Sequence, residues 1–487
     1  MADARKKIAV VLTHGIGEQI PMETLRGFVD AAWVANTDAQ WRSPSDENPA
    51  DIWFKPDVTA GSFELRRVTT RWTRSKTGAI AKGPRVDFFE FYWADLAEGT
   101  TMDEIWDWLR TLLQRWPSQV PQGLMSAWIL LWVAVAVVTI LSMLAISPWP
   151  GGWWHVGFAA AAAMVGYVTK NLISPYIGDV ARYVRADPRN IAIRRAIRER
   201  GMLLLNDLHD SGRYERIIMV AHSLGSIIAY DLVTLLWTSR GKALELRENE
   251  PAFLKLRAVE SAAHSLAAAS AHDLKQRRCA YREAQRTFRL ALRSGGEDGT
   301  ERTRKPEEEW LISDLVTLGS PLAHAEFLLA RDAADLNEKV SRWLYPTNWP
   351  QFQKIESEQR AKIDDRTEPP TALILGPAGG LFSYFLAPPM TWSLHHSAPF
   401  AAVRWTNIYD PHRLIFKGDI VSGPVAPVFG EGVRDIDLSQ LRGQSAGFSH
   451  TLYWSLETAD VAGQPKPHIK ALQNAIDLLD RPDSEIW

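Results

Sequence analysis

A short apolar run, a tight turn and an apolar helix follow one another near the middle of the chain, and this order limits the fold more than any other feature. Residues 216–221 (RIIMVA) are rich in β-branched side chains and predict a buried strand. Residues 224–237 predict a helix. Ser223 stands between them, with the small residues Ala221 and Gly225 two positions away on either side. A buried strand that turns sharply into a helix indicates a mostly parallel sheet covered by helices.

The rest of the chain repeats this alternation, which indicates the α/β class. Residues 199–209 predict a further helix. Further strands are predicted at residues 8–12, 63–72, 86–93, 315–318 and 403–409. Because strands alternate with helices, we expect one central, mostly parallel sheet with helices on both faces.

A long stretch of the chain, residues 116–169, contains no Asp, Glu, Lys or Arg. Residues 124–146 and 153–173 are each long and apolar enough to cross a hydrocarbon layer of about 30 Å as a helix. A turn with Pro and Gly separates them, and small residues in the second segment would let two helices approach closely. We therefore predict a transmembrane hairpin, with a buried helical hairpin in a soluble core as the alternative.

Basic residues flank the predicted hairpin, whereas its turn carries no charge. Arg110 and Arg115 precede it, and Lys170, Arg182 and Arg185 are among the residues that follow it. The positive-inside rule therefore places both ends of the hairpin in the cytoplasm. The predicted location is thus that of a multi-pass membrane protein, with two helices in the bilayer and its catalytic domain in the cytoplasm.

Charge and composition give no indication of a nucleic-acid partner, a disulfide or a metal site. The net charge of −2 at pH 7 gives no indication of a nucleic-acid partner. The single cysteine, Cys279, leaves no intramolecular disulfide to form and fits a reducing compartment. The His, Cys, Asp and Glu residues lack the spacing of a metal site, so no metal is predicted.

Ser223 is the candidate nucleophile. A serine on a sharp turn between strand and helix presents its hydroxyl to a substrate, provided that the residues at plus and minus two are small. Gly225 meets this condition, and Ala221 carries only a methyl group where glycine is more usual. Serine also favours the N-cap of a helix, and a purely capping role for Ser223 is the alternative.

The sequence His14-Gly15-Ile16-Gly17 follows the first predicted strand and is a candidate oxyanion-binding loop. In such sites a loop of this kind supplies one backbone N–H, and the residue after the nucleophile supplies the other. The two residues are Ile16 and Leu224. Each donor would stabilise a tetrahedral oxyanion by roughly 3 kcal/mol. We expect His14 to be a structural residue of the loop and not a base.

A serine nucleophile needs a base to accept its proton and an acid to orient that base. The chain order Ser, Asp, His places both of them after Ser223. Two acids, Asp410 and Asp419, follow the predicted strand at 403–409; we favour Asp419, while Asp410 stays open as the alternative. His450 is the candidate base.

Five segments, in this order, resemble those of the α/β-hydrolase superfamily, in particular its lipase- and esterase-like bacterial membrane-associated members: VLTHGIG, VAHSLG, VTLGSPL, NIYDP–GDIVSGP and FSHTLYW. The resemblance extends over nearly the whole chain, except for the insertions. It implies an α/β-hydrolase fold and hydrolysis of an ester through an acyl-enzyme, with no cofactor. The same fold also hosts peptidases, amidases, acyltransferases and inactive relatives.

This resemblance divides the chain into a hydrolase domain and three insertions. The hydrolase parts are residues 1–115, 174–241, 310–321 and 403–487, of which the second contains the nucleophile and the last contains the acid and the base. The insertions are residues 116–173, 242–309 and 322–402. The first holds the hairpin, the second is helical with charges expected to face solvent, and the third is lid-like, with ordinary core packing as its alternative.

We therefore predict a membrane-anchored serine hydrolase that cleaves a carboxylic ester, with a lipid or another amphiphilic acyl ester as its substrate. A serine peptidase, an amidase or an acyltransferase that uses the same three residues is the alternative among enzymes. The alternative outside enzymes is a catalytically inactive membrane scaffold. The sequence identifies no protein partner.

Overall fold

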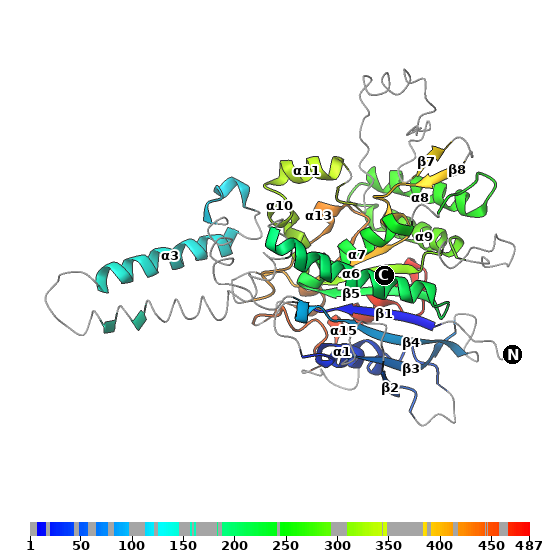
Figure 1. The fold of residues 1–487 in the computed structure, drawn as a ribbon, viewed down its shortest axis with the longest axis horizontal. Coiled ribbons are helices and arrows are strands. Elements are labelled where there is room, and N and C mark those ends of the chain that lie inside the picture. Colours follow the sequence, from blue (N-terminus) through cyan, green and yellow to red (C-terminus); the bar gives the residue numbers. More distant parts are fainter. Residues whose placement is uncertain are drawn as a thin grey trace, which may run out of the picture.

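The computed structural model describes much of the chain (Figure 1). The described residues are 7–15, 20–42, 48–56, 65–75, 82–96, 113–120, 125–145, 156–157, 160–161, 183, 188–240, 244–293, 309–342, 344–347, 383–386, 391–412, 417–443, 445, 447–456 and 466–487.

One mixed sheet of eight strands forms the centre of this described part, in the order β10-β9-β6-β5-β1-β4-β3-β2 (Figure 1). Strand β3 is antiparallel to β2 and β4, and the other neighbouring strands are parallel. The strands are β1 (Lys7–Thr13), β2 (Ile52–Pro56), β3 (Arg66–Arg74), β4 (Lys82–Phe91), β5 (Tyr214–His222), β6 (Ile312–Leu318), β9 (Arg404–Tyr409) and β10 (Arg434–Asp437). A separate antiparallel ladder pairs β7 (Ser383–Leu386) with β8 (Thr391–Leu394). Each strand predicted from the sequence overlaps a strand of the central sheet.

The order of the strands reverses at β1, which lies between β4 and β5. Thr13 is level with Ala221, Ala221 with Thr317, and Thr317 with Asn407. The carboxyl ends of β1, β5, β6 and β9 therefore meet at one end of the sheet. In open α/β sheets, a site usually forms outside the carboxyl ends of the strands at such a reversal.

Helices cover the sheet along its length. Helix α7 (Leu224–Arg240) packs against α6 (Pro188–Asp210) and β5, α1 (Glu23–Val29) contacts β4, and α15 (Pro467–Ile476) contacts β6 and β9. The π-helix η1 (Asp30–Val34) continues α1. The other helical segments include η2 (Ala94–Leu96), η3 (Pro117–Gln119), η8 (Pro321–His324), α10 (Ala325–Leu328), α11 (Ala333–Ser341), η9 (Pro399–Ala401), α13 (Ala426–Phe429), α14 (Leu438–Arg442) and α16 (Asp483–Ile486).

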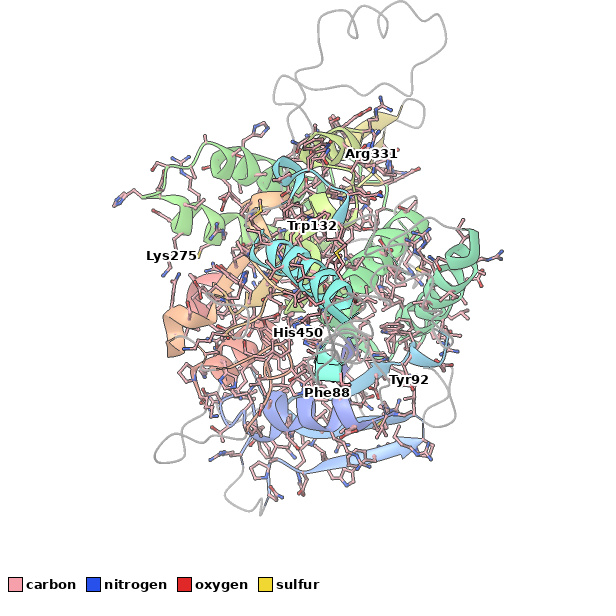
Figure 2. All side chains as sticks on the ribbon, turned by 90° about the vertical axis from the view of Figure 1, so that its left-hand side faces the viewer. Phe88, Tyr92, Trp132, Lys275, Arg331 and His450 are labelled. Atoms are coloured by element: carbon pink, nitrogen blue, oxygen red, sulfur yellow. The ribbon has the colours of Figure 1, made fainter. Side chains whose placement is uncertain are left out.

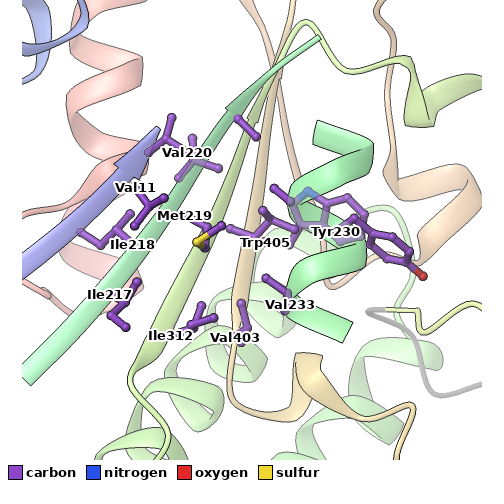
Figure 3. Close-up of a cluster of buried hydrophobic side chains, with 14 of the residues drawn as sticks. Val11, Ile217, Ile218, Met219, Val220, Tyr230, Val233, Ile312, Val403 and Trp405 are labelled. Atoms are coloured by element: carbon purple, nitrogen blue, oxygen red, sulfur yellow. The ribbon is translucent and has the colours of Figure 1, made fainter. Parts of the chain in front are cut away.

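The core forms where apolar side chains of the strands meet the helices. Met219 of β5 and Trp405 of β9 lie on the side of the sheet that faces α7, while Ile218 points to the other side of β5 (Figure 3). The ring centroids of Tyr230 and Trp405 are 5.7 Å apart. Successive side chains of a strand point to opposite faces, so a strand covered on both sides needs apolar residues at consecutive positions. This explains the continuous apolar run in β5.

The predicted hairpin of two transmembrane helices, residues 124–146 and 153–173, is wrong for this structure. Helix α3 (Met125–Ala145) extends away from the sheet (Figure 1), whereas the structure describes only residues 156–157 and 160–161 of the second segment. Among all described residues, no helix is both long enough and apolar enough to cross a membrane. The absence of charge permits a membrane-spanning helix but is not sufficient for one, because a span also needs enough length and enough apolar surface in a single helix. The cytoplasmic orientation inferred from this hairpin stays a prediction.

The charged insertion at residues 242–309 contains α8 (Pro251–Ala267) and α9 (Leu274–Ala291), which pack against each other. Lys275, at the start of α9, lies at the periphery of the molecule (Figure 2). Arg282 and Arg289, however, are only 2% and 1% exposed. The expectation that the charges of this insertion face solvent is therefore wrong for Arg282 and Arg289, which meet buried carboxylates.

Eight side chains form what we call the buried charge cluster: Arg216, Arg282, Arg289, Arg404, Asp314, Asp477, Asp480 and Asp483. Asp314 accepts hydrogen bonds from Arg216 at 2.5 Å and from Arg404 at 2.8 Å. Arg289 pairs with Asp480 at 2.7 Å. The cluster ties β5, β6, β9 and α9 to the C-terminal segment.

Asp314→Asn is expected to lower the free energy of unfolding by about 3–5 kcal/mol, because it leaves buried guanidinium groups without their shared counter-charge. Urea denaturation followed by circular dichroism measures this change. Glu199→Gln is the matched control, because Glu199 pairs with Arg195 on the surface, where both side chains are more than half exposed. We expect that control to change the stability little. A small effect of Asp314→Asn would contradict the prediction.

The carboxylate of Asp314 also makes the free energy of unfolding depend on pH in the acidic range. Burial raises the pKa of Asp314, but Arg404 and Arg216 lower it by more, so that the pKa in the folded protein lies below its usual value. The stabilisation is therefore complete above about pH 4 and is lost as the pH falls through the folded-state pKa. The wild type should lose stability more steeply below pH 4 than Asp314→Asn does. Equal slopes would show that this ion pair does not control acid unfolding.

Candidate active site

The strand β5 passes into α7 through Ser223, whose backbone φ is +52°. This left-handed conformation is strained for a residue with a side chain and is typical of functional turns. The backbone N–H of Ser223 donates to the carbonyl of Leu318 at 3.0 Å. A Cβ at Gly225 would lie 2.4 Å from the carbonyl oxygen of His14, so only glycine fits there. The methyl group of Ala221 is fully buried, and the turn forms without a glycine at this position.

His450 lies in residues 447–456, which we call the base loop. Its Nε2 is 2.8 Å from the hydroxyl of Ser223, and its Nδ1 is 2.9 Å from Oδ2 of Asp419. A carboxylate only accepts, so Nδ1 carries the proton and Nε2 accepts from the hydroxyl. Residues separated by 227 positions in the chain therefore meet in one hydrogen-bonded line. The side chains of all three residues are buried.

Asp419 is held by further donors on both of its oxygens. The backbone N–H of Val421 donates to Oδ1 at 2.9 Å, and the hydroxyl of Tyr453 donates to Oδ2 at 2.6 Å. Burial raises the pKa of Asp419, but His450 and the hydrogen bonds from His450 and Tyr453 lower it by more. Its pKa therefore lies below the usual value, and the carboxylate stays ionised beside the imidazole.

Asp410, the alternative acid, contacts the base loop at a different point. Its Oδ2 accepts from the hydroxyls of Ser445 at 2.6 Å and Ser449 at 2.5 Å. Ser449 is the residue before His450, and its backbone N–H donates to the carbonyl of Gly418. The geometry therefore places Asp419 at the imidazole and Asp410 at the segment that carries it.

Gly319 and Tyr453 support the site, and the sequence analysis did not single out either of them. Gly319 has a φ of +59°, and a Cβ there would lie 2.7 Å from Tyr453 and 3.0 Å from Oδ2 of Asp419. Any side chain at this position would therefore displace Tyr453 or the acid Asp419. The segments VTLGSPL and FSHTLYW contain both residues, so the signal lay in their position at strand ends and beside the candidate base.

Of the two oxyanion-hole candidates, the structure describes one. Leu224 is the first residue of α7, where backbone N–H groups point away from the helix and favour negative charge. Ile16 lies outside the described residues. His14 accepts from the backbone N–H of Trp93 at 3.2 Å and stacks on its ring. Burial lowers the pKa of His14 to about 4, which fits the structural role expected for it.

The hydroxyls of Ser226 and Ser320 stabilise the turn at Ser223. Ser226 donates to the carbonyl of Ser223 at 2.6 Å and is 2.7 Å from the hydroxyl of Ser320. Ser320 also accepts from the backbone N–H of Leu322. These bonds join the first turn of α7 to the end of β6 and fix the carbonyl of the strained residue.

The described residues contain no group of three or more His, Cys, Asp and Glu side chains that could hold a metal ion. No family model, curated protein or solved structure matches this chain. The resemblance to the α/β-hydrolase superfamily therefore stays a prediction, and what the site does is inferred from its own geometry and motifs.

Proposed function

We propose that this protein is a serine hydrolase that cleaves a carboxylic ester through an acyl-enzyme. The observation that carries the proposal is the line from Ser223 through His450 to Asp419, with separations of 2.8 and 2.9 Å. A serine hydroxyl is a weak nucleophile until a positioned base accepts its proton, and this line supplies that base together with the acid that orients it.

In the first half of the reaction the oxygen of Ser223 attacks the ester carbonyl while Nε2 of His450 accepts the hydroxyl proton. Asp419 stabilises the resulting imidazolium. The backbone N–H of Leu224 and, by the sequence prediction, that of Ile16 donate to the oxyanion. The alcohol leaves as it takes the proton from His450, and the acyl group stays on Ser223.

In the second half a water molecule attacks the acyl-enzyme and gives its proton to Nε2 of His450. Collapse of the intermediate returns this proton to Ser223 and releases the carboxylic acid. No residue other than Ser223, His450 and Asp419 has to change its protonation state.

Exposed apolar side chains on the base loop support an amphiphilic acyl ester as the substrate. Phe448, Leu452 and Leu456 are 45%, 40% and 44% exposed. The ring centroid of Phe448 lies 5.9 Å from that of His450. These side chains would contact the apolar part of an ester whose carbonyl lies at Ser223.

Labelling with a fluorophosphonate tests the proposal. The probe forms a bond from phosphorus to the oxygen of an activated serine and releases fluoride. We expect a single adduct on Ser223 in the wild type and none in Ser223→Ala, as measured by mass spectrometry of peptides. Ser239→Ala, an exposed serine on the same helix, is the matched control and should label like the wild type.

Labelling of the wild type at another residue, or equal labelling of Ser223→Ala, would overturn the proposal. A panel of acyl esters and matched acyl amides then separates the ester hydrolase from a peptidase or amidase. We expect turnover of the esters to exceed that of the amides, and the opposite result would reject ester specificity.

A further inference from the structure

The imidazole of His222 lies between three segments of the candidate site. Its Nε2 is 2.7 Å from the backbone carbonyl oxygen of His450. Its Nδ1 faces the loop after β1, since a Cβ on Gly15 would lie 2.9 Å from that atom. The ring is also 4.8 Å from the ring of His450 and 5.1 Å from that of Trp454, measured between centroids. His222 therefore contacts the loop of the candidate oxyanion hole and the base loop, and it directly precedes the nucleophile.

The carbonyl of His450 can only accept, so Nε2 of His222 carries the proton. Burial, with a smaller effect of His450, lowers the pKa of His222 to about 3. The ring is thus neutral at ordinary pH, with its proton on Nε2 and its bare Nδ1 toward Gly15. A neutral ring at this point does not repel the imidazolium that His450 becomes during the proposed reaction.

We propose that His222 is a positioning residue that fixes the catalytic base through its backbone. This inference rests on the proposed function. The backbone on the N-terminal side of His450 is held at Ser449 by Asp410 and Gly418, and His222 holds the carbonyl on the C-terminal side. With both sides held, the ring of His450 is directed at Ser223.

Three substitutions at this position separate the hydrogen bond from the volume of the ring. His222→Gln places an amide N–H2 at the same distance along the side chain as Nε2 and can still donate to the carbonyl. In His222→Asn the amide is one carbon shorter and cannot reach it. His222→Leu removes the donor altogether. Initial rates with a short-chain nitrophenyl ester give kcat and KM for each full-length variant.

We expect His222→Leu and His222→Asn to lower kcat by about 10- to 100-fold with KM nearly unchanged, because a small displacement of a catalytic group lowers the rate by this order. His222→Gln should stay within about threefold of the wild type by the same reasoning. Equal activities of the Gln and Asn variants, or an effect on KM alone, would overturn the inference.

His209→Leu is the matched control for the loss of a buried histidine. His209 is 1% exposed, lies 2.7 Å from the carbonyl of Leu205 and accepts from the backbone N–H of Leu311. This variant should lower the melting temperature while the kcat of the folded protein stays unchanged. If His222→Leu or His222→Asn does not fold, the ratio of the rate of His222→Gln to that of the remaining variant decides the outcome. If His222→Gln does not fold, the kcat of the other two variants relative to the wild type decides it.

The two failures are distinguishable. If the wild type shows no hydrolysis that depends on Ser223, both the proposed function and the role of His222 are lost. If that hydrolysis is present and His222→Leu leaves kcat at the wild-type value, only the positioning role is lost.

Discussion

His450→Ala is expected to lower kcat for a nitrophenyl ester by about 10⁶-fold, because the hydroxyl of Ser223 then has no acceptor for its proton. The distance of 2.8 Å between Nε2 and the hydroxyl makes this histidine the direct partner of the nucleophile. KM should change little, since the substrate binds through other contacts. Stopped-flow or extended end-point assays of purified protein measure the residual rate.

A comparison with Ser223→Ala tests whether His450 and Ser223 act in the same step. Residues that act as a unit show non-additive effects, so the double variant should be no slower than either single variant. A thermal melt shows that each variant is folded before its rate is interpreted. A fall of less than tenfold in His450→Ala, or additive effects in the double variant, would contradict a shared role.

The second large effect concerns the two neighbouring carboxylates. Asp419→Asn should lower kcat by about 10⁴-fold, because an amide no longer fixes the tautomer of His450 or stabilises its charged form. Asp410→Asn keeps an oxygen that accepts from Ser445 and Ser449 and should lower kcat by less than about tenfold, as expected for support of the backbone alone.

The pair is well matched, because both side chains are fully buried and the backbone N–H of Asp419 donates to the carbonyl of Asp410 at 3.0 Å. Initial rates at one pH, with a thermal melt of each variant, measure the difference in kcat between the two variants. A larger effect of Asp410→Asn on kcat would transfer the role of the acid to Asp410.

The sequence predicted those parts of the site that depend on local chemistry. The turn at Ser223 follows from a β-branched run, a helix and a small residue at 225, where the backbone of His14 leaves no room for a Cβ. The order of the motifs also pointed to His450. The choice between Asp410 and Asp419 could not be made locally, because it depends on which carboxylate the distant base loop approaches.

Long-range packing also explains the failed predictions. The arginines of α9 look solvent-facing in sequence, and only the folded C-terminal segment brings Asp480 and Asp483 to them. The role of His222 depends on a carbonyl 228 residues away. The hairpin prediction rests on the charge-free composition of residues 116–169, and composition alone is not sufficient for a membrane-spanning helix.

The buried charge cluster has a consequence for how the protein is made. Asp477, Asp480 and Asp483 come later in the chain than the arginines on β5, β9 and α9 that they neutralise. During synthesis, the part of the core that contains these arginines cannot pack fully until the three aspartates have been added to the chain. A product that ends before Asp477 would bury Arg282 and Arg289 without these carboxylates, and cellular proteases would remove it.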